Sequence, residues 1–330
     1  MKNNLRIIIS VGLLAFLAWR TDWQQVGRAF ATMQVHFWLA AVGLLITAQL
    51  VSAVRWLSLA IPLGLKRPLL RMIGFYFIGM YFNLVLPTSV GGDVVRAWYL
   101  DGNSGKKLPA FVSVFLDRLC GLWILISLAC LGVIFSPLAL PSWISWTVWG
   151  IAACAVLGMA SMPVLSQHSD KAPNKIRRVF EALRALPNRK AWLVPVSLSV
   201  FIQLSNVLIV WLVGLSIGVD VPLAYFFVMV PMVSLLTMLP LSVNGMGVRE
   251  GGMVVLLAPL GVASGVAVTL ALLWFTVSAV VSLLGGLVYA FGHFPRPAVA
   301  TVTQEEGVGD HGTIGGDSDQ GREGQYQAAA

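Results

Sequence analysis

The sequence predicts an all-α polytopic membrane protein with about six full transmembrane helices and two re-entrant helical hairpins in an inverted repeat. Three observations support this fold class. The 330 residues are 58% hydrophobic and only 11% charged, whereas soluble domains are about 25% charged. Long apolar runs recur between residues 7 and 291. A short segment that combines helix-breaking residues with an arginine occurs twice at the end of such runs.

The first apolar run covers residues 7–19 and follows Lys2 and Arg6. A signal peptide would also begin this way, but no small-x-small cleavage site follows Ala18, so we expect a retained span. Residues 22–33 place their apolar side chains on one helical face, which predicts a short helix lying in the membrane interface. The remaining full spans are expected at residues 36–59, 111–135, 143–164, 192–217 and 265–291.

Two further apolar runs, residues 72–86 and 222–239, are shorter than the ~20 residues that a perpendicular span needs. Each ends in a copy of one eleven-residue motif. Residues 86–96 read LPTSVGGDVVR and residues 239–249 read LPLSVNGMGVR, with seven identical positions. A repeated, charged helix-breaking segment at membrane depth is typical of a transporter's binding site.

The repeat extends beyond the motif, back to residues 38 and 192, through matching Trp, Gln and Gly-x-x-x-Pro-Leu anchors. Chance similarity between apolar segments is the alternative, and the shared anchors favour an internal duplication. We therefore divide the chain into a membrane domain, residues 1–292, and a Gly-, Ser- and acid-rich tail, residues 293–330, expected to be disordered. Within the membrane domain the repeats cover residues 38–135 and 192–291.

The loop charges predict how the two repeats are oriented. The loops at residues 66–71, 106–107 and 167–190 are basic, and the last carries seven basic and two acidic residues, a net charge of +5. All three are expected on the cytoplasmic side, together with both termini. This requires residues 72–100 to enter and leave from the cytoplasm, and residues 222–263 from the opposite side. A parallel repeat of full spans would instead place the +5 loop outside. Apolar residues at helical spacing predict a surface helix in that loop.

The motif residues suit the binding of an anion. Prolines 87 and 240 end the incoming helices, and the glycines allow the backbone to approach a ligand closely. The helix N-termini that follow favour a negative charge, and Arg96 and Arg249 offer planar forks suited to phosphate. We expect two half-sites for a phosphate-bearing head group. The candidate substrate-binding residues are Asn83, Pro87, Ser89, Gly91, Gly92, Arg96, Asp117, Arg118, Ser242, Asn244, Gly245, Gly247, Arg249 and Glu250.

A purely structural reading of the same charges stays open. Arg96 with Asp117, and Arg249 with Glu250, would then form ion pairs that hold the hairpins together. Asp117 and Arg118 are expected to form a structural pair with each other near the cytoplasmic face. The serines and asparagines can bind either a ligand or frayed backbone. Arg55, near the end of its span, is expected to snorkel to the surface.

Several function classes find no support in the sequence. It contains no nucleophile elbow, no Walker loop and no acidic cluster spaced for magnesium. The four histidines are scattered, and the three cysteines lie inside apolar runs without metal-ligand spacing. The net charge of +8 is expected to be cytoplasmic loop charge rather than a nucleic-acid footprint. We therefore expect no enzyme, no metal, no cofactor and no nucleic-acid partner.

Three ordered motifs resemble one family. Asn83-x-x-x-Pro87-x-x-x-Gly91-Gly92-x-x-x-Arg96 is followed by Asp117-Arg118-x-x-Gly121 and by Pro240-x-x-x-Asn244-Gly245-x-Gly247-x-Arg249-Glu250-Gly251. Together they are similar to the lysylphosphatidylglycerol synthetase membrane-region family, also called flippase-like, and the resemblance covers about residues 5–292. Asp117 stands where many relatives carry Glu.

The resemblance implies a flippase for a phospholipid or lipid-linked precursor in a bacterial cytoplasmic membrane. Family members with a cytosolic aminoacyl-transferase domain make lysyl-phosphatidylglycerol, and their membrane part moves it to the outer leaflet. Here only a 38-residue polar tail follows the last span, so we do not expect lysyl transfer. The implied partners are membrane lipids with an anionic or phosphate-bearing head group. Two alternatives remain: a non-transporting partner of a separate glycosyl- or aminoacyl-transferase, and an ion-coupled carrier for a small anion.

Overall fold

A computed structural model of the chain describes residues 23–86, 90–102, 104–136, 140–167, 192–238 and 242–292, together with Gly12, Trp19 and Phe294. Within these residues all regular secondary structure is helical. The expected first span, the basic loop with its surface helix and the tail lie outside the described residues, apart from these isolated positions. Pro87, Ser89 and Pro240 lie outside them as well.

Five helices of the described residues are long and apolar enough to cross a membrane: α3 (Val35–Ala60), α6 (Lys107–Ile134), α7 (Ser142–Gln167), α9 (Leu193–Ser216) and α12 (Ser264–Phe291). Each coincides with an expected span to within a few residues. The long apolar runs form helices because a bilayer leaves backbone polar groups no partner except each other. The short helix α2 (Trp23–Ala31) was also predicted. It packs on α12 and buries Val26 and Ala29 while leaving Trp23 and Phe30 exposed.

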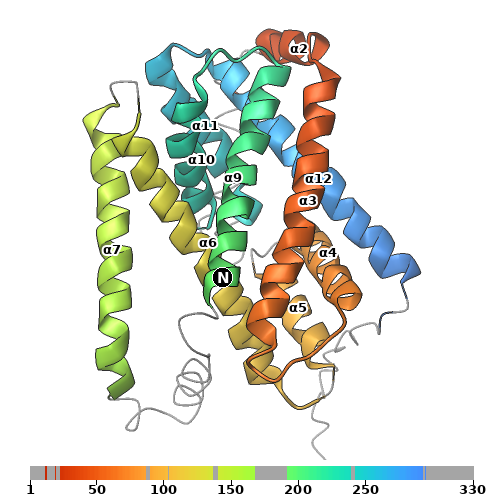
Figure 1. The fold of residues 1–330 in the computed structure, drawn as a ribbon. Helices are drawn as coiled ribbons and strands as arrows, with labels where there is room; N and C mark the ends of the chain where they lie inside the picture. Colours follow the sequence, from red (N-terminus) through yellow and green to blue (C-terminus); the bar gives the residue numbers. More distant parts are fainter. Residues whose placement is uncertain are drawn as a thin grey trace, which may run out of the picture. The chain divides into compact units, whose positions relative to one another are not determined.

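Between the long helices, two pairs of short helices fold back on themselves. The first pair is α4 (Leu69–Val85) and α5 (Gly91–Asp101), and the second is α10 (Leu223–Met238) and α11 (Val248–Leu257). Short 3-10 turns at Val243–Gly245 and Ala258–Leu260 flank α11. In each pair the two helices contact each other. In Figure 1 the α4–α5 hairpin lies toward the lower ends of the long helices, and the α10–α11 hairpin toward their upper ends.

The first hairpin closes because its two helices meet at glycines. A Cβ atom on Gly92 would lie 1.9 Å from the carbonyl oxygen of Gly79, so only glycine permits this approach. Asn83 then bridges the break, since its Oδ1 accepts the N–H of Gly92 at 2.8 Å. Gly102, in the left-handed conformation at φ 50°, ends α5.

The second hairpin turns through three positive-φ positions within four residues: Asn244 (φ 51°), Gly245 (φ 72°) and Gly247 (φ 82°). The side chain of Glu250 caps the new helix, because its Oε2 accepts the N–H of Gly247 at 2.7 Å. On α10, the hydroxyl of Tyr225 donates to the carbonyl of Leu256 and ties the two arms together.

The core that holds the hairpins is formed by equivalent helices of the two predicted repeats. Helices α3 and α9 pack along each other, as Figure 1 shows. Helix α12 packs on α4, where Gly285 lies directly against the backbone of Phe77: a Cβ there would be 1.9 Å from the Phe77 carbonyl oxygen. Helix α6 packs against α10 and α5. Close contacts with the long helices therefore hold both hairpins in place.

Candidate functional site

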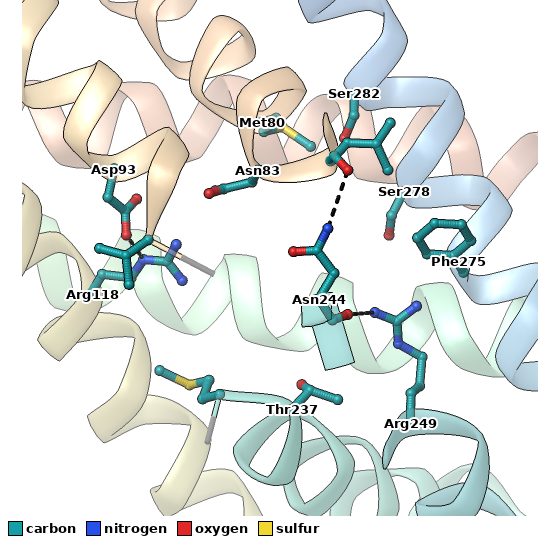
Figure 2. Close-up of a pocket in the computed structure, with 13 residues that line it drawn as sticks. Met80, Asn83, Asp93, Arg118, Thr237, Asn244, Arg249, Phe275, Ser278 and Ser282 are labelled. Atoms are coloured by element: carbon teal, nitrogen blue, oxygen red, sulfur yellow. Dashed lines mark hydrogen bonds and ion pairs between the residues drawn. The ribbon is translucent and has the colours of Figure 1, made fainter. Parts of the chain in front are cut away.

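The tips of the two hairpins contact each other. The side-chain amide of Asn244, on the second tip, donates to the carbonyl oxygen of Leu84 at the end of α4, at 3.2 Å. These residues lie 160 positions apart. The contact joins the end of α4, just before the first copy of the repeated motif, to the second copy, and Figure 2 shows Asp93 of the first copy beside the same space as Asn244 and Arg249 of the second.

A cavity of about 460 Å³ opens beside this contact. Its walls come from both hairpins and from α6 and α12 (Figure 2). The volume is within the usual ~300–1,000 Å³ of small-molecule sites. The lining residues are Met80, Asn83, Leu84, Val90, Asp93, Arg118, Thr237, Met238, Asn244, Arg249, Phe275, Ser278 and Ser282. We call it the tip cavity.

Arg249 is one of two cationic side chains in the tip cavity. It is half-buried, and its Nη2 donates to the carbonyl oxygen of Asn244 at 3.3 Å. Its guanidinium carbon lies 5.5 Å from the ring centroid of Trp274 and 5.3 Å from that of Phe275. Within the described part of the chain it forms no ion pair with a carboxylate. The alternative in which Arg249 pairs with Glu250 is wrong, because Glu250 caps the helix instead.

Arg118 is the other cation of the tip cavity, and its side chain is 43% exposed. Its Nε donates to Oδ2 of Asp93 at 2.9 Å. The expected pairing of Arg118 with Asp117 is wrong. Adjacent residues on a helix point about 100° apart, so the two side chains reach different neighbours.

Asp117 lies at the centre of a buried ion network instead. Asp117 is 1% exposed. It lies about 15 Å along the helix axis from the start of α6 at Lys107. Its Oδ1 accepts from Nε of Arg55 at 2.8 Å, and its Oδ2 accepts from Nη2 of Arg96 at 3.0 Å. Arg96 also approaches Asp93 at 3.5 Å. The structural reading of Arg96 with Asp117 is therefore confirmed as an ion pair.

Arg55 does not snorkel, contrary to expectation. It is 5% exposed, and its Nη1 donates to Oγ of Ser199 on α9 at 3.0 Å. The reason is the buried carboxylate of Asp117, which offers a stronger partner than the distant interface. Arg96 is held further by two aromatic rings, with its guanidinium carbon 4.3 Å from the centroid of Trp56 and 4.0 Å from that of Tyr76.

Arg96 and Arg249, the arginines of the two motif copies, line two different, adjoining cavities. Arg96 lines a smaller cavity of about 240 Å³, which we call the amide cavity, whereas Arg249 lines the tip cavity. The two cavities share Met80, Asn83, Arg118 and Met238. The full lining of the amide cavity is Gln49, Ser52, Arg55, Tyr76, Met80, Asn83, Arg96, Asp117, Arg118, Gly121, Leu122, Leu125, Ile202, Gln203, Asn206 and Met238.

Most of the other predicted residues serve the hairpin backbones. Gly91 begins α5, and a Cβ on Gly245 would lie 2.8 Å from Thr237. Ser242 is buried, and its hydroxyl has no hydrogen-bond partner among the described residues. Arg55, Gln49, Gln203 and Asn206 line the amide cavity but were not predicted as site residues. A signal for one pair existed, because Gln49 and Gln203 are matching anchors of the repeat.

The apolar spanning helices and the paired hairpins define a multi-pass integral membrane protein. The lysylphosphatidylglycerol synthase TM region family matches residues 3–286, so the chain belongs to that family.

A curated relative is the UPF0104 membrane protein PH1989 of Pyrococcus horikoshii, 26% identical over 122 residues. That match covers 36% of this chain, and the chain spans 36% of the relative's length. No solved structure matches the chain.

Proposed function

We propose that the protein is a flippase that moves a phospholipid or lipid-linked precursor across a bacterial cytoplasmic membrane. The observation that carries the proposal is the tip cavity, where Arg249 stands without a carboxylate partner among the described residues. A cation at this depth is costly unless a charge compensates it. The phosphate of a head group would supply that charge.

Other features of the tip cavity support an anionic ligand. Arg118 and Arg249 carry two positive charges against the single carboxylate of Asp93. Helix α5 begins at Gly91, beside Val90 in the cavity wall, and α11 begins at Val248, next to Arg249. The helix dipole at both starts favours a negative charge, beyond the Glu250 carboxylate that already caps α11. The apolar side chains of Met80, Met238 and Phe275 suit the adjoining glycerol or acyl part.

The proposed topology is an inverted repeat of six full spans with two re-entrant hairpins, both termini being cytoplasmic. The direction of the chain supports this topology. Helix α3 runs to the lower end of the bundle, where α4 begins, whereas α9 runs to the upper end, where α10 begins (Figure 1). Movement of one repeat against the other would expose the tip cavity to either side of the membrane. In this proposal the membrane domain has no catalytic role, and its partners are lipids.

A proteoliposome assay tests the proposal. Purified protein is reconstituted with fluorescent phospholipids or polyprenyl phosphates, and the fraction of label moved between leaflets is measured. We expect Arg249→Gln to lower the rate at least ~tenfold, since one charged hydrogen bond is worth about 1.5–3 kcal/mol. Arg28→Gln is the matched control, because Arg28 is exposed on α2 and its side chain bonds only to Gln24 among the described residues.

Equal transport by the wild type and Arg249→Gln would overturn the assignment of the site. Saturable lipid binding without transport would favour a non-transporting partner of a separate transferase. Reporter fusions within residues 168–190 test the topology independently: a cytoplasmic signal is expected, and an external signal would contradict the inverted repeat.

A further inference from the structure

The amide cavity has features that lipid transport through the tip cavity does not require. Four of its polar side chains come from the packed helices α3 and α9: Gln49 and Ser52 on one, and Gln203 and Asn206 on the other. They occupy matching positions, 154 residues apart, in the two repeats. On each helix they are three residues apart and so lie on the same face. Such polar groups are expensive inside a membrane and mark functional positions.

Part of this polar surface is already satisfied within the protein. Gln203 donates to the carbonyl of Gly121 at 2.8 Å and accepts from Asn206 at 3.0 Å. The Ser52 hydroxyl donates to the carbonyl of Ala48 in its own helix. Gln49 also lines the cavity, but no hydrogen bond of its amide is seen in the described part of the chain. Its two N–H donors are therefore available to a ligand.

Arg96, which lines the same cavity, carries a second unused donor. Arg96 is 4% exposed, and its Nε is buried with no hydrogen-bond partner among the described residues. Its two terminal nitrogens already bond to Asp117 and Asp93. An unpaired, buried N–H of a cation costs its full desolvation energy, so a bound acceptor at this position would be favourable.

The net charge of the ion network around Asp117 indicates that the bound acceptor is an anion. Its three guanidiniums, from Arg55, Arg96 and Arg118, face only the two carboxylates of Asp93 and Asp117. Arg55, Arg96, Arg118 and Asp117 all line the amide cavity, and no other acidic residue among the described ones lines it. The network therefore carries one positive charge in excess, and a bound anion would offset it.

We propose that the amide cavity binds a singly charged anion, held by the guanidinium edge of Arg96 and the amide of Gln49. A small free anion and the phosphodiester of a lipid share this chemistry. The site differs from the proposed head-group site, since Gln49 lines only the amide cavity and Arg249 lines only the tip cavity. This second anion site does not depend on whether the protein moves lipids.

The test measures the apparent unfolding temperature of the purified full chain in neutral detergent. Potassium bromide is titrated against potassium gluconate at constant ionic strength, and dihexanoyl phosphatidylglycerol is titrated separately. Binding to the folded state raises the unfolding temperature in a saturable way. We expect Gln49→Leu to raise the half-saturating concentration at least ~tenfold, as expected for the loss of one hydrogen bond to a charged ligand.

Two controls use the same helices and cavities. Thr47→Val, at an exposed position two residues before Gln49, should leave the half-saturating anion concentration unchanged. Arg249→Gln should leave the half-saturating bromide concentration unchanged, which separates this site from the tip cavity proposed to bind a lipid head group. Gly121→Ala is a second site variant, because Gly121 lines the amide cavity and its added Cβ would make van der Waals contact with Nε2 of Gln203 at 3.4 Å and Nη1 of Arg55 at 3.5 Å. It should weaken binding without removing a charge.

The outcomes are distinct. A Gln49-sensitive shift with bromide identifies a free anion, and one seen only with phosphatidylglycerol identifies the lipid phosphodiester. The proposal is overturned if neither anion gives a saturable shift, or if Gln49→Leu and Gly121→Ala both bind with the wild-type midpoint.

Discussion

Replacing Asp117 with asparagine removes the carboxylate that holds two buried guanidiniums. The side chains of Asp117, Arg55 and Arg96 are 2%, 6% and 5% exposed, so water cannot replace the lost charge. Breaking a buried ion pair by removing one partner costs about 3–5 kcal/mol. For a chain of this size, at about 2–4 °C per kcal/mol, the unfolding temperature should fall by about 10 °C. The assay is thermal unfolding of the purified protein in detergent.

Two variants serve as controls for this prediction. Asp93→Asn also removes a carboxylate, but Asp93 pairs most closely with Arg118, whose side chain is 43% exposed. Solvent then screens the unpaired cation, and the loss should be about 1 kcal/mol. Asp117→Glu retains the charge and should restore most of the stability. If Asp117→Asn costs no more than Asp93→Asn, or if Asp117→Glu is as damaging as Asp117→Asn, the buried carboxylate does not stabilise the two guanidiniums as described.

The hairpin tips give two further predictions. Gly92→Ala should destabilise the protein by about 3 kcal/mol or more, because the new Cβ would lie 1.9 Å from the backbone of the facing helix; Gly43→Ala, with nothing within 4 Å, should be neutral or stabilising in the same unfolding assay. Asn244→Gly should cost about 1 kcal/mol through the lost bond to Leu84, whereas Asn244→Ala should cost about 1–2 kcal/mol more because its φ is 51°. Equal losses for the two Asn244 variants would contradict the role of the left-handed backbone.

The lengths of the apolar runs predicted the helices well. Residues 36–59 and 265–291 became α3 and α12 with boundaries within one residue, because a long apolar run has few alternatives to a helix. The two short runs also became short helices that end at the repeated motif. The motif was informative because proline, glycine and arginine each have a local physical consequence at membrane depth.

The partners of the charges could not be predicted in the same way. Arg55 and Asp117 lie 62 residues apart, and hydropathy gives no register between their helices. Which of Asp117 and Arg118 faces the network depends on the rotation of α6, which its nearly uniform apolar sequence leaves open. Arg118 therefore appears opposite Arg249 in the tip cavity, and Arg96 in the adjoining one.

The most direct test of the central claim is native mass spectrometry of the lipid that copurifies with the protein. The tip cavity is proposed to hold a phosphate-bearing head group through Arg249. Wild type and the Arg28→Gln control should retain a phosphate-bearing lipid, and Arg249→Gln should retain at least ~tenfold less. The same lipid at the same occupancy in Arg249→Gln would contradict the account.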